Sequence, residues 1–211
     1  MADFASMIQG YHRFHETQWA HERDRWAELS QGQSPKVMVI ACADSRVDPA
    51  QIFGAAPGEI FVIRNVANLV PPYEVGGGLH GVSAALEFAV TQLEVEEIVV
   101  MGHAACGGCK ASLTRVFDGA ELGSGGFVAG WVGALAPARD RVIARLGGGD
   151  GDDAQREMEW EGVRQSLGNL MTFPFVRERV EDGRLKLQGA WFGIADGALR
   201  VMDRNGEFRA A

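Results

Sequence analysis

Two stretches decide the fold of this chain: residues 36–46 (KVMVIACADSR) and residues 97–106 (EIVVMGHAAC). Each begins with a short apolar run rich in β-branched residues, which is typical of a buried strand. Each run leads directly into residues that carry chemistry, which are Cys42 in the first stretch and His103 and Cys106 in the second. Because ligands of parallel sheets bind beyond the carboxyl ends of the strands, we expect these three side chains to lie at that edge.

Two thiols and one imidazole form a donor set that suits zinc. Catalytic zinc typically takes three protein ligands and leaves one position for water, and Cys42, His103 and Cys106 make such a set. Asp44 follows Cys42 closely, and Arg46 can hold its carboxylate ionised and oriented, because guanidinium pairs bidentately with carboxylate. The pattern predicts a catalytic zinc site, with a merely structural ion pair as the alternative for Asp44 and Arg46.

The rest of the chain alternates apolar strands with helical patterns. A further strand is predicted at residues 59–64 (EIFVIR). Helices are expected at residues 79–93, 107–116 and 154–168 and after Pro174, a closing hairpin at residues 185–194 and 198–203, and surface loops at residues 123–126 and 147–153. Continuous apolar strands alternating with helices predict an α/β fold, with a mainly parallel central sheet and helices on both faces.

The chain begins with an amphipathic helix, because apolar residues recur at helical spacing over residues 4–14. The pattern continues to about residue 32. A length of 211 residues fits one α/β domain, so we expect a single domain over residues 1–211, with residues 1–32 as a helical arm. The apolar face of this arm suits packing on another subunit or on its own chain.

Composition and charge exclude several classes of protein. The formal net charge of −8 gives no basic surplus for nucleic-acid phosphates, so no nucleic-acid partner is expected. No apolar stretch is long enough to span a bilayer, and residues 1–10 lack the pattern of a secretory signal. Three cysteines are an odd number for a disulfide framework. A cytoplasmic protein with metal-bound thiolates, and no membrane partner, is therefore expected.

Four ordered sequence blocks resemble one known family. The pairing of C-x-D-S-R at residues 42–46 with G-H-x-x-C-G-G at residues 102–108 is similar to the signature of the β-class carbonic anhydrases. Residues 57–61 (PGEIF) and 64–68 (RNVAN) also match the family pattern, in the expected order. The likeness is close over residues 36–113 and looser over the remainder.

This resemblance implies reversible hydration of carbon dioxide to bicarbonate and a proton, with a zinc-bound hydroxide as the nucleophile. It implies that Cys42, His103 and Cys106 bind one zinc per chain, and that Asp44 and Arg46 form the catalytic dyad. If that dyad breaks, Asp44 becomes a conditional fourth zinc ligand. The family forms dimers or tetramers, so a homodimer or homotetramer is expected.

The resemblance also implies a substrate pocket. Phe61 and Val66 would help to line it, partly across a dimer interface, and the backbone of Gly107 would lie against the substrate. Core packing is the alternative for Phe61 and Val66. Family members with an allosteric bicarbonate pocket carry a tryptophan three residues before the first zinc cysteine, where this chain has Val39, so that pocket is expected to be absent.

Other functions remain open at this stage. Cys106 and Cys109 form a C-x-x-C sequence, which is also found in thiol–disulfide oxidoreductases. A zinc-stabilised binding module would use four permanent protein ligands. Relatives that hydrolyse carbon disulfide or carbonyl sulfide would share the zinc chemistry. His80 is a conceivable proton shuttle, with an incidental loop histidine as the alternative.

Overall fold

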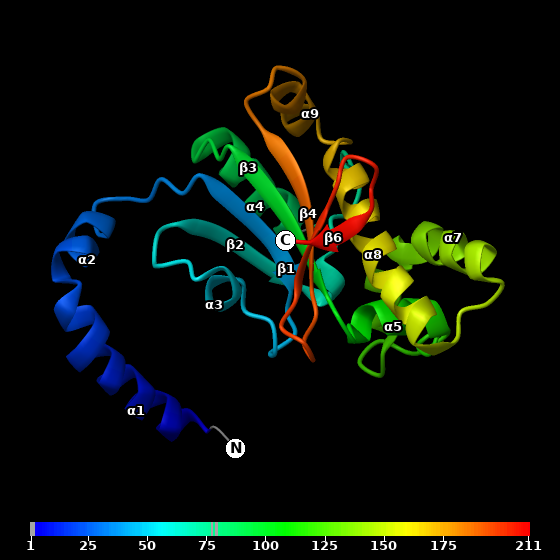
Figure 1. Ribbon diagram of the computed structural model, residues 1–211, viewed down its shortest axis with the longest axis horizontal. Helices are drawn as coiled ribbons and strands as arrows, with labels where there is room; N and C mark the ends of the chain where they lie inside the picture. Colours follow the sequence, from blue (N-terminus) through cyan, green and yellow to red (C-terminus); the bar gives the residue numbers. More distant parts are fainter. Residues whose placement is uncertain (1–2, 77, 79) are drawn as a thin grey trace. The chain divides into compact units, whose positions relative to one another are not determined.

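The structure is a computed structural model that describes residues 3–76, 78 and 80–211 (Figure 1). The chain forms two compact units, Met1–Ser34 and Pro35–Ala211. The helical elements of the first unit are α1 (Phe4–Phe14), the π-helical turn η1 (His15–Trp19) and α2 (Arg23–Leu29). The predicted N-terminal helix is therefore confirmed, although it is interrupted. The wider expectation of one domain with a helical arm stays a prediction.

The second unit is built on a six-stranded sheet with the strand order β2-β1-β3-β4-β5-β6. The strands are β1 (Val37–Cys42), β2 (Ile60–Asn65), β3 (Glu97–His103), β4 (Lys186–Phe192), β5 (Leu199–Met202) and β6 (Phe208–Ala210). Strands β2, β1, β3 and β4 are parallel to one another. Strand β5 is antiparallel to β4, and β6 is antiparallel to β5. This arrangement confirms the mainly parallel sheet and the closing hairpin.

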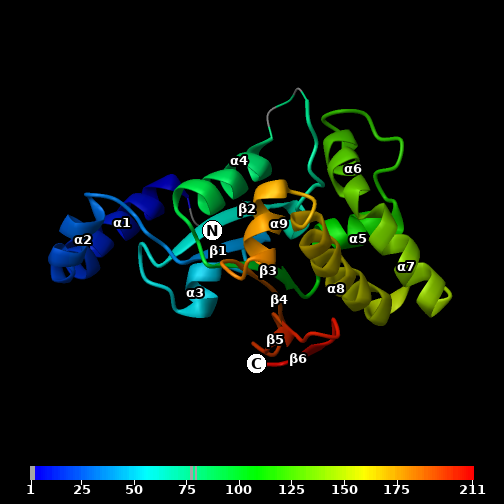
Figure 2. The ribbon, with the colours of Figure 1, turned by 90° about the horizontal axis from the view of Figure 1, so that it is seen from above.

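Helices lie on both faces of the sheet, as the sequence predicts. Figure 2 shows α4 and α9 on one side of the strands and α3 on the other. The helical elements are α3 (Pro49–Phe53), η2 (Val66–Asn68), α4 (Gly81–Glu87), η3 (Phe88–Gln92), α5 (Gly107–Thr114), α6 (Gly126–Val132), η4 (Gly133–Leu135), α7 (Ala136–Leu146), α8 (Gly151–Leu170) and α9 (Pro174–Glu181). Among the described residues, no helix has both the length and the apolar character needed to cross a membrane.

The sheet is buried on both faces, which explains why its central strands are apolar without alternation. On the face covered by α4, α8 and α9, Met38 and Val100 belong to the largest core cluster together with Phe173. On the opposite face, the neighbouring strand residues Val39 and Met101 form a smaller cluster. Burial of both faces favours a central position for β1 and β3, and their parallel pairing directs their carboxyl ends to one edge.

Several boundaries differ from the prediction. The predicted loop at residues 147–153 is wrong from Gly151 onward, because α8 begins there and places acidic side chains in its first turn, where the helix dipole favours them. The predicted loop at residues 123–126 is likewise one residue too long, because Gly126 is the first residue of α6. The predicted helix at residues 79–93 is described from Gly81, and its first position, Leu79, lies outside the described residues.

Candidate metal centre

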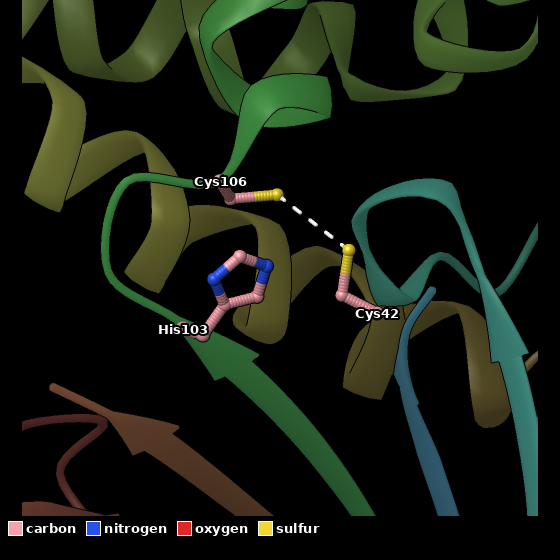
Figure 3. Close-up of side chains that lie close together, drawn as sticks. All are labelled: Cys42, His103 and Cys106. Atoms are coloured by element: carbon pink, nitrogen blue, oxygen red, sulfur yellow. Dashed lines mark hydrogen bonds between the residues drawn. The ribbon is translucent and has the colours of Figure 1, made fainter. Parts of the chain in front are cut away.

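Three predicted ligand residues meet at the carboxyl edge of the two central strands (Figure 3). Cys42 is the last residue of β1, and His103 is the last residue of β3, which pairs with β1 in parallel. Cys106 follows one tight turn later as the N-cap of α5. Ala105 has a φ of 54° in that turn, which brings the chain back over the strand ends. Residues 103–109 are called the metal loop below.

The donor atoms have the spacing that a single ion requires. The sulfur atoms of Cys42 and Cys106 lie 4.0 Å apart, and all three donor atoms lie within 4.8 Å of one another. Two Zn–S bonds of about 2.3 Å at the tetrahedral angle separate their sulfurs by about 3.8 Å. Across residues 3–76, 78 and 80–211, this is the one group of three or more metal-binding side chains.

The chemistry of the donors also fits a metal ion. The Nδ1 atom of His103 lies 2.9 Å from the carbonyl oxygen of Ala104, while its buried Nε2 has no hydrogen-bond partner among the described residues. A proton on Nδ1 leaves Nε2 with a free lone pair. The hydrogen bond with Cys106, together with burial, raises the pKa of the Cys42 thiol to about 12. The Cys42 thiolate is therefore disfavoured without a nearby cation, and a bound metal ion would stabilise it.

Asp44 and Arg46 form the expected pair beside this cluster. Arg46 donates from Nε to Oδ1 of Asp44 at 2.9 Å and from Nη2 to Oδ2 at 2.7 Å, and its backbone N–H donates to Oδ1 at 3.0 Å. These bonds hold the pKa of Asp44 well below its usual range. Oδ2 of Asp44 lies 3.9 Å from Nε2 of His103, so an ionised carboxylate faces the donor cluster.

Arg64 fixes the loop that carries Cys42 and Asp44, a role that the sequence analysis missed. Its Nε donates to the carbonyl oxygen of Cys42 at 2.9 Å, and its Nη2 donates to those of Asp44 and Val47 at 2.6 and 3.1 Å. Its Nη1 pairs with Asp48 at 3.1 Å. The sequence signals were an arginine at the end of a largely apolar strand and its place in the matched block at residues 64–68, and neither reveals what the side chain binds.

The three residues predicted to line the substrate pocket do not all lie near the metal cluster. Gly107 is the exposed first residue of α5, where backbone N–H groups lack partners within the helix. Val66 contacts the same helix end near Gly108. Phe61 instead packs against Phe88, and its strand partner precedes Cys42 by four residues, or about 13 Å along the strand. One chain thus brings Val66 and Gly107, but not Phe61, close to the metal cluster.

The close approach of α5 to the segment after β2 gives a stability prediction. A Cβ atom on Gly108 would lie 2.7 Å from Cγ1 of Val66 and 2.9 Å from Cβ of Ala67. We expect Gly108→Ala to lower the free energy of unfolding by about 1–3 kcal/mol, because overpacking forces the backbone to shift. Gly107→Ala is the matched control, since its Cβ would meet no heavy atom within 4 Å. Equal denaturant midpoints for both variants would contradict the prediction.

The chain is similar to known proteins over most of its length. A family model described as carbonic anhydrase matches residues 37–199. The chain is 38% identical to beta carbonic anhydrase 3 of Arabidopsis thaliana over 194 residues, which are 92% of this chain and 74% of that protein.

Solved structures show the same similarity. The β-carbonic anhydrase CcaA superposes with a TM-score of 0.90 and 32% identity over 100% of both chains. A Coccomyxa β-carbonic anhydrase in complex with acetazolamide gives a TM-score of 0.83 and 30% identity, over 96% of this chain and 87% of that chain.

The chain belongs to the β-carbonic anhydrase family, whose members hydrate carbon dioxide with zinc as cofactor. It is an α/β zinc enzyme, and Cys42, His103 and Cys106 form a candidate metal cluster in it.

Proposed function

We propose that Cys42, His103 and Cys106 are the three protein ligands of one zinc ion per chain and that this centre hydrates carbon dioxide. The observation that carries the proposal is the buried sulfur–sulfur–nitrogen cluster, whose donor atoms all lie within 4.8 Å of one another. Bound zinc supplies a Lewis acid that lowers the pKa of a coordinated water from 15.7 to about 7. Three protein ligands leave the fourth position for that water.

Asp44 and Arg46 are the proposed catalytic pair. The Asp44 carboxylate accepts a hydrogen bond from the attacking oxygen, which turns a lone pair of that oxygen toward the carbon of carbon dioxide. Arg46 keeps the carboxylate ionised and anchors it to the metal loop, because its Nη2 also donates to the carbonyl oxygen of Ala105 at 3.1 Å. The reaction adds one water to carbon dioxide and releases bicarbonate and one proton.

The site is proposed to work mainly in this open arrangement. Asp44 is paired with Arg46 here. It would become a fourth zinc ligand only if that pair broke. Val39 is buried in the sheet core at the position where a bicarbonate-binding tryptophan would be required, so we propose that the allosteric pocket is absent.

The substrate pocket and the assembly are also proposals. Val66 and the Gly107 backbone lie beside the metal loop, and we propose that Phe61 reaches a pocket across a subunit interface. A homodimer or homotetramer would supply that interface, and a 27% identical structure of Sordaria macrospora enzymes, with a TM-score of 0.82 over 94% of this chain and 96% of that one, is described as tetrameric. Free Cys42, Cys106 and Cys109 support a cytoplasmic location.

Stopped-flow carbon dioxide hydration on metal-quantified protein tests the proposal. We expect about one zinc per chain, and loss of both zinc and activity together after treatment with a strong chelator. Carbon disulfide and carbonyl sulfide serve as parallel substrates, because each is a small linear molecule that is electrophilic at carbon. A zinc-loaded protein that leaves carbon dioxide unchanged would reject the proposed reaction, and activity without bound metal would reject the proposed centre.

A further inference from the structure

A buried glutamate of helix α8 contacts the metal loop. Glu159 lies on α8, with only 2% of its surface exposed. Its Oε1 accepts the backbone N–H of Cys106 at 3.0 Å, and its Oε2 accepts the indole N–H of Trp191 at 3.0 Å. Helix α8, strand β4 and the metal loop therefore meet at one carboxylate.

Gln155 extends this contact by one helical turn. Its Nε2 donates to Oε1 of Glu159 at 2.7 Å and to the carbonyl oxygen of Cys106 at 3.1 Å. Residues four apart on a helix share one face, so both side chains reach the loop together. The N–H and the C=O of Cys106 are thus both bound by side chains of α8, and we call Gln155, Glu159 and Trp191 the carboxylate clamp.

A buried carboxylate with neutral hydrogen-bond donors is unusual in a protein core. The hydrogen-bond donors given above for Glu159 are neutral N–H groups, and burial raises the pKa of its carboxyl. An apolar side chain would fill the same space without the desolvation penalty of a carboxylate. An apolar side chain could not accept a hydrogen bond from the N–H of Cys106. The backbone of that residue sets where its sulfur points.

We propose that Glu159 is a positioning residue that, with Gln155 and Trp191, holds the Cys106 sulfur in its ligand position and slows the loss of zinc. The inference rests on the proposed function, because it requires Cys106 to be a zinc ligand. Groups that orient a metal ligand typically change metal affinity by about 10–100-fold when they are removed. The carboxylate is not part of the donor cluster and accepts N–H groups of Cys106, Gln155 and Trp191, so its effect passes through the Cys106 backbone.

The test measures zinc transfer from the holoenzyme to a chromophoric chelator. We expect Glu159→Ala to release zinc about 10–100-fold faster than the wild type. The zinc-release rate of Glu159→Gln should lie between those of the wild type and Glu159→Ala. Its amide oxygen still accepts the Cys106 N–H, but its NH₂ group faces the Trp191 N–H. Gln155→Ala removes a half-buried side chain, so it keeps the test usable if the Glu159 variants fold poorly, and it should also accelerate release.

Glu161→Ala is the matched control for a merely structural role. Glu161 is 5% exposed on the same helix, but it pairs with Arg141 and Arg164 away from the metal loop. We expect its removal to lower the thermal midpoint without accelerating zinc release. Wild-type release rates in the Glu159 and Gln155 variants would overturn the clamp, as would equal acceleration in the Glu161 variant. A wild-type chain that binds no zinc would instead overturn the proposed function, and the clamp with it.

Discussion

Cys42→Ser is expected to reduce the zinc content of the purified protein from about one ion per chain to near zero. Serine has nearly the same shape, but its hydroxyl does not ionise as a thiol does, and zinc prefers the softer sulfur. The Lewis acid contributes several kcal/mol to the reaction, so carbon dioxide hydration should fall by at least about a thousandfold. Metal analysis and stopped-flow kinetics on the same preparation measure both effects.

Cys109→Ser is the control for this variant. Cys109 is also free and buried, and it lies three residues after Cys106, but it is not part of the donor cluster. We expect this variant to retain zinc. A Cys42→Ser protein that kept one tightly bound zinc would show that the cluster has been assigned wrongly. Zinc loss in both variants, with loss of the fold, would show only that buried thiols are needed for packing.

Arg46→Ala is expected to retain zinc and to lose about 99% of the hydration rate. The substitution removes two side-chain bonds that hold the Asp44 carboxylate and the bond to the metal loop at Ala105. A misplacement of about 1 Å at a reacting centre can lower a rate by about a hundredfold. Arg46→Lys should recover only part of the rate, because an ammonium group cannot bind both carboxylate oxygens in the same geometry.

The chain contains a matched control for Arg46. Arg184 pairs with Asp182 two residues earlier through the same three donor groups, although its Nε and Nη2 both donate to Oδ2 of Asp182. This second pair lies before β4, at the opposite ends of the strands from the metal cluster. Arg184→Ala should therefore leave the rate unchanged. Full activity in zinc-replete Arg46→Ala protein would reduce the Asp44–Arg46 pair to a structural ion pair.

Much of the fold was predictable from local patterns. The strands β1 and β3 are continuous apolar runs, because both faces of the sheet are covered there, and such runs stand out from the polar segments around them. The edge strand β2 is also largely apolar, although it is only half-buried. The short elements were not predicted. Helix α3 has only five residues, although Asp48 caps it and Gly54 ends it with a φ of 62°. Strand β6 has three residues, too few to show a period.

Buried polar side chains were the least predictable feature of the site. A charged side chain is almost never fully buried unless it is paired, so Glu159 would be expected on the solvent face of its helix. Its place depends on how closely α8 approaches the sheet. Gly102 permits that approach, since a Cβ there would lie 2.8 Å from Val163 on α8. The sequence around Glu159 and the sequence around Gly102 do not reveal that α8 approaches the sheet so closely.

The sequence by itself determined which donor atoms the protein can offer to zinc and that two central strands carry them to one edge. This is so because strand propensity and the tight metal loop act over a few neighbouring residues. Only the tertiary structure decided that Glu159 and Gln155 bind the backbone of Cys106 and that Phe61 lies away from the cluster within one chain. Cys106 and Glu159 are 53 positions apart, and the packing of α8 on the sheet brings them together.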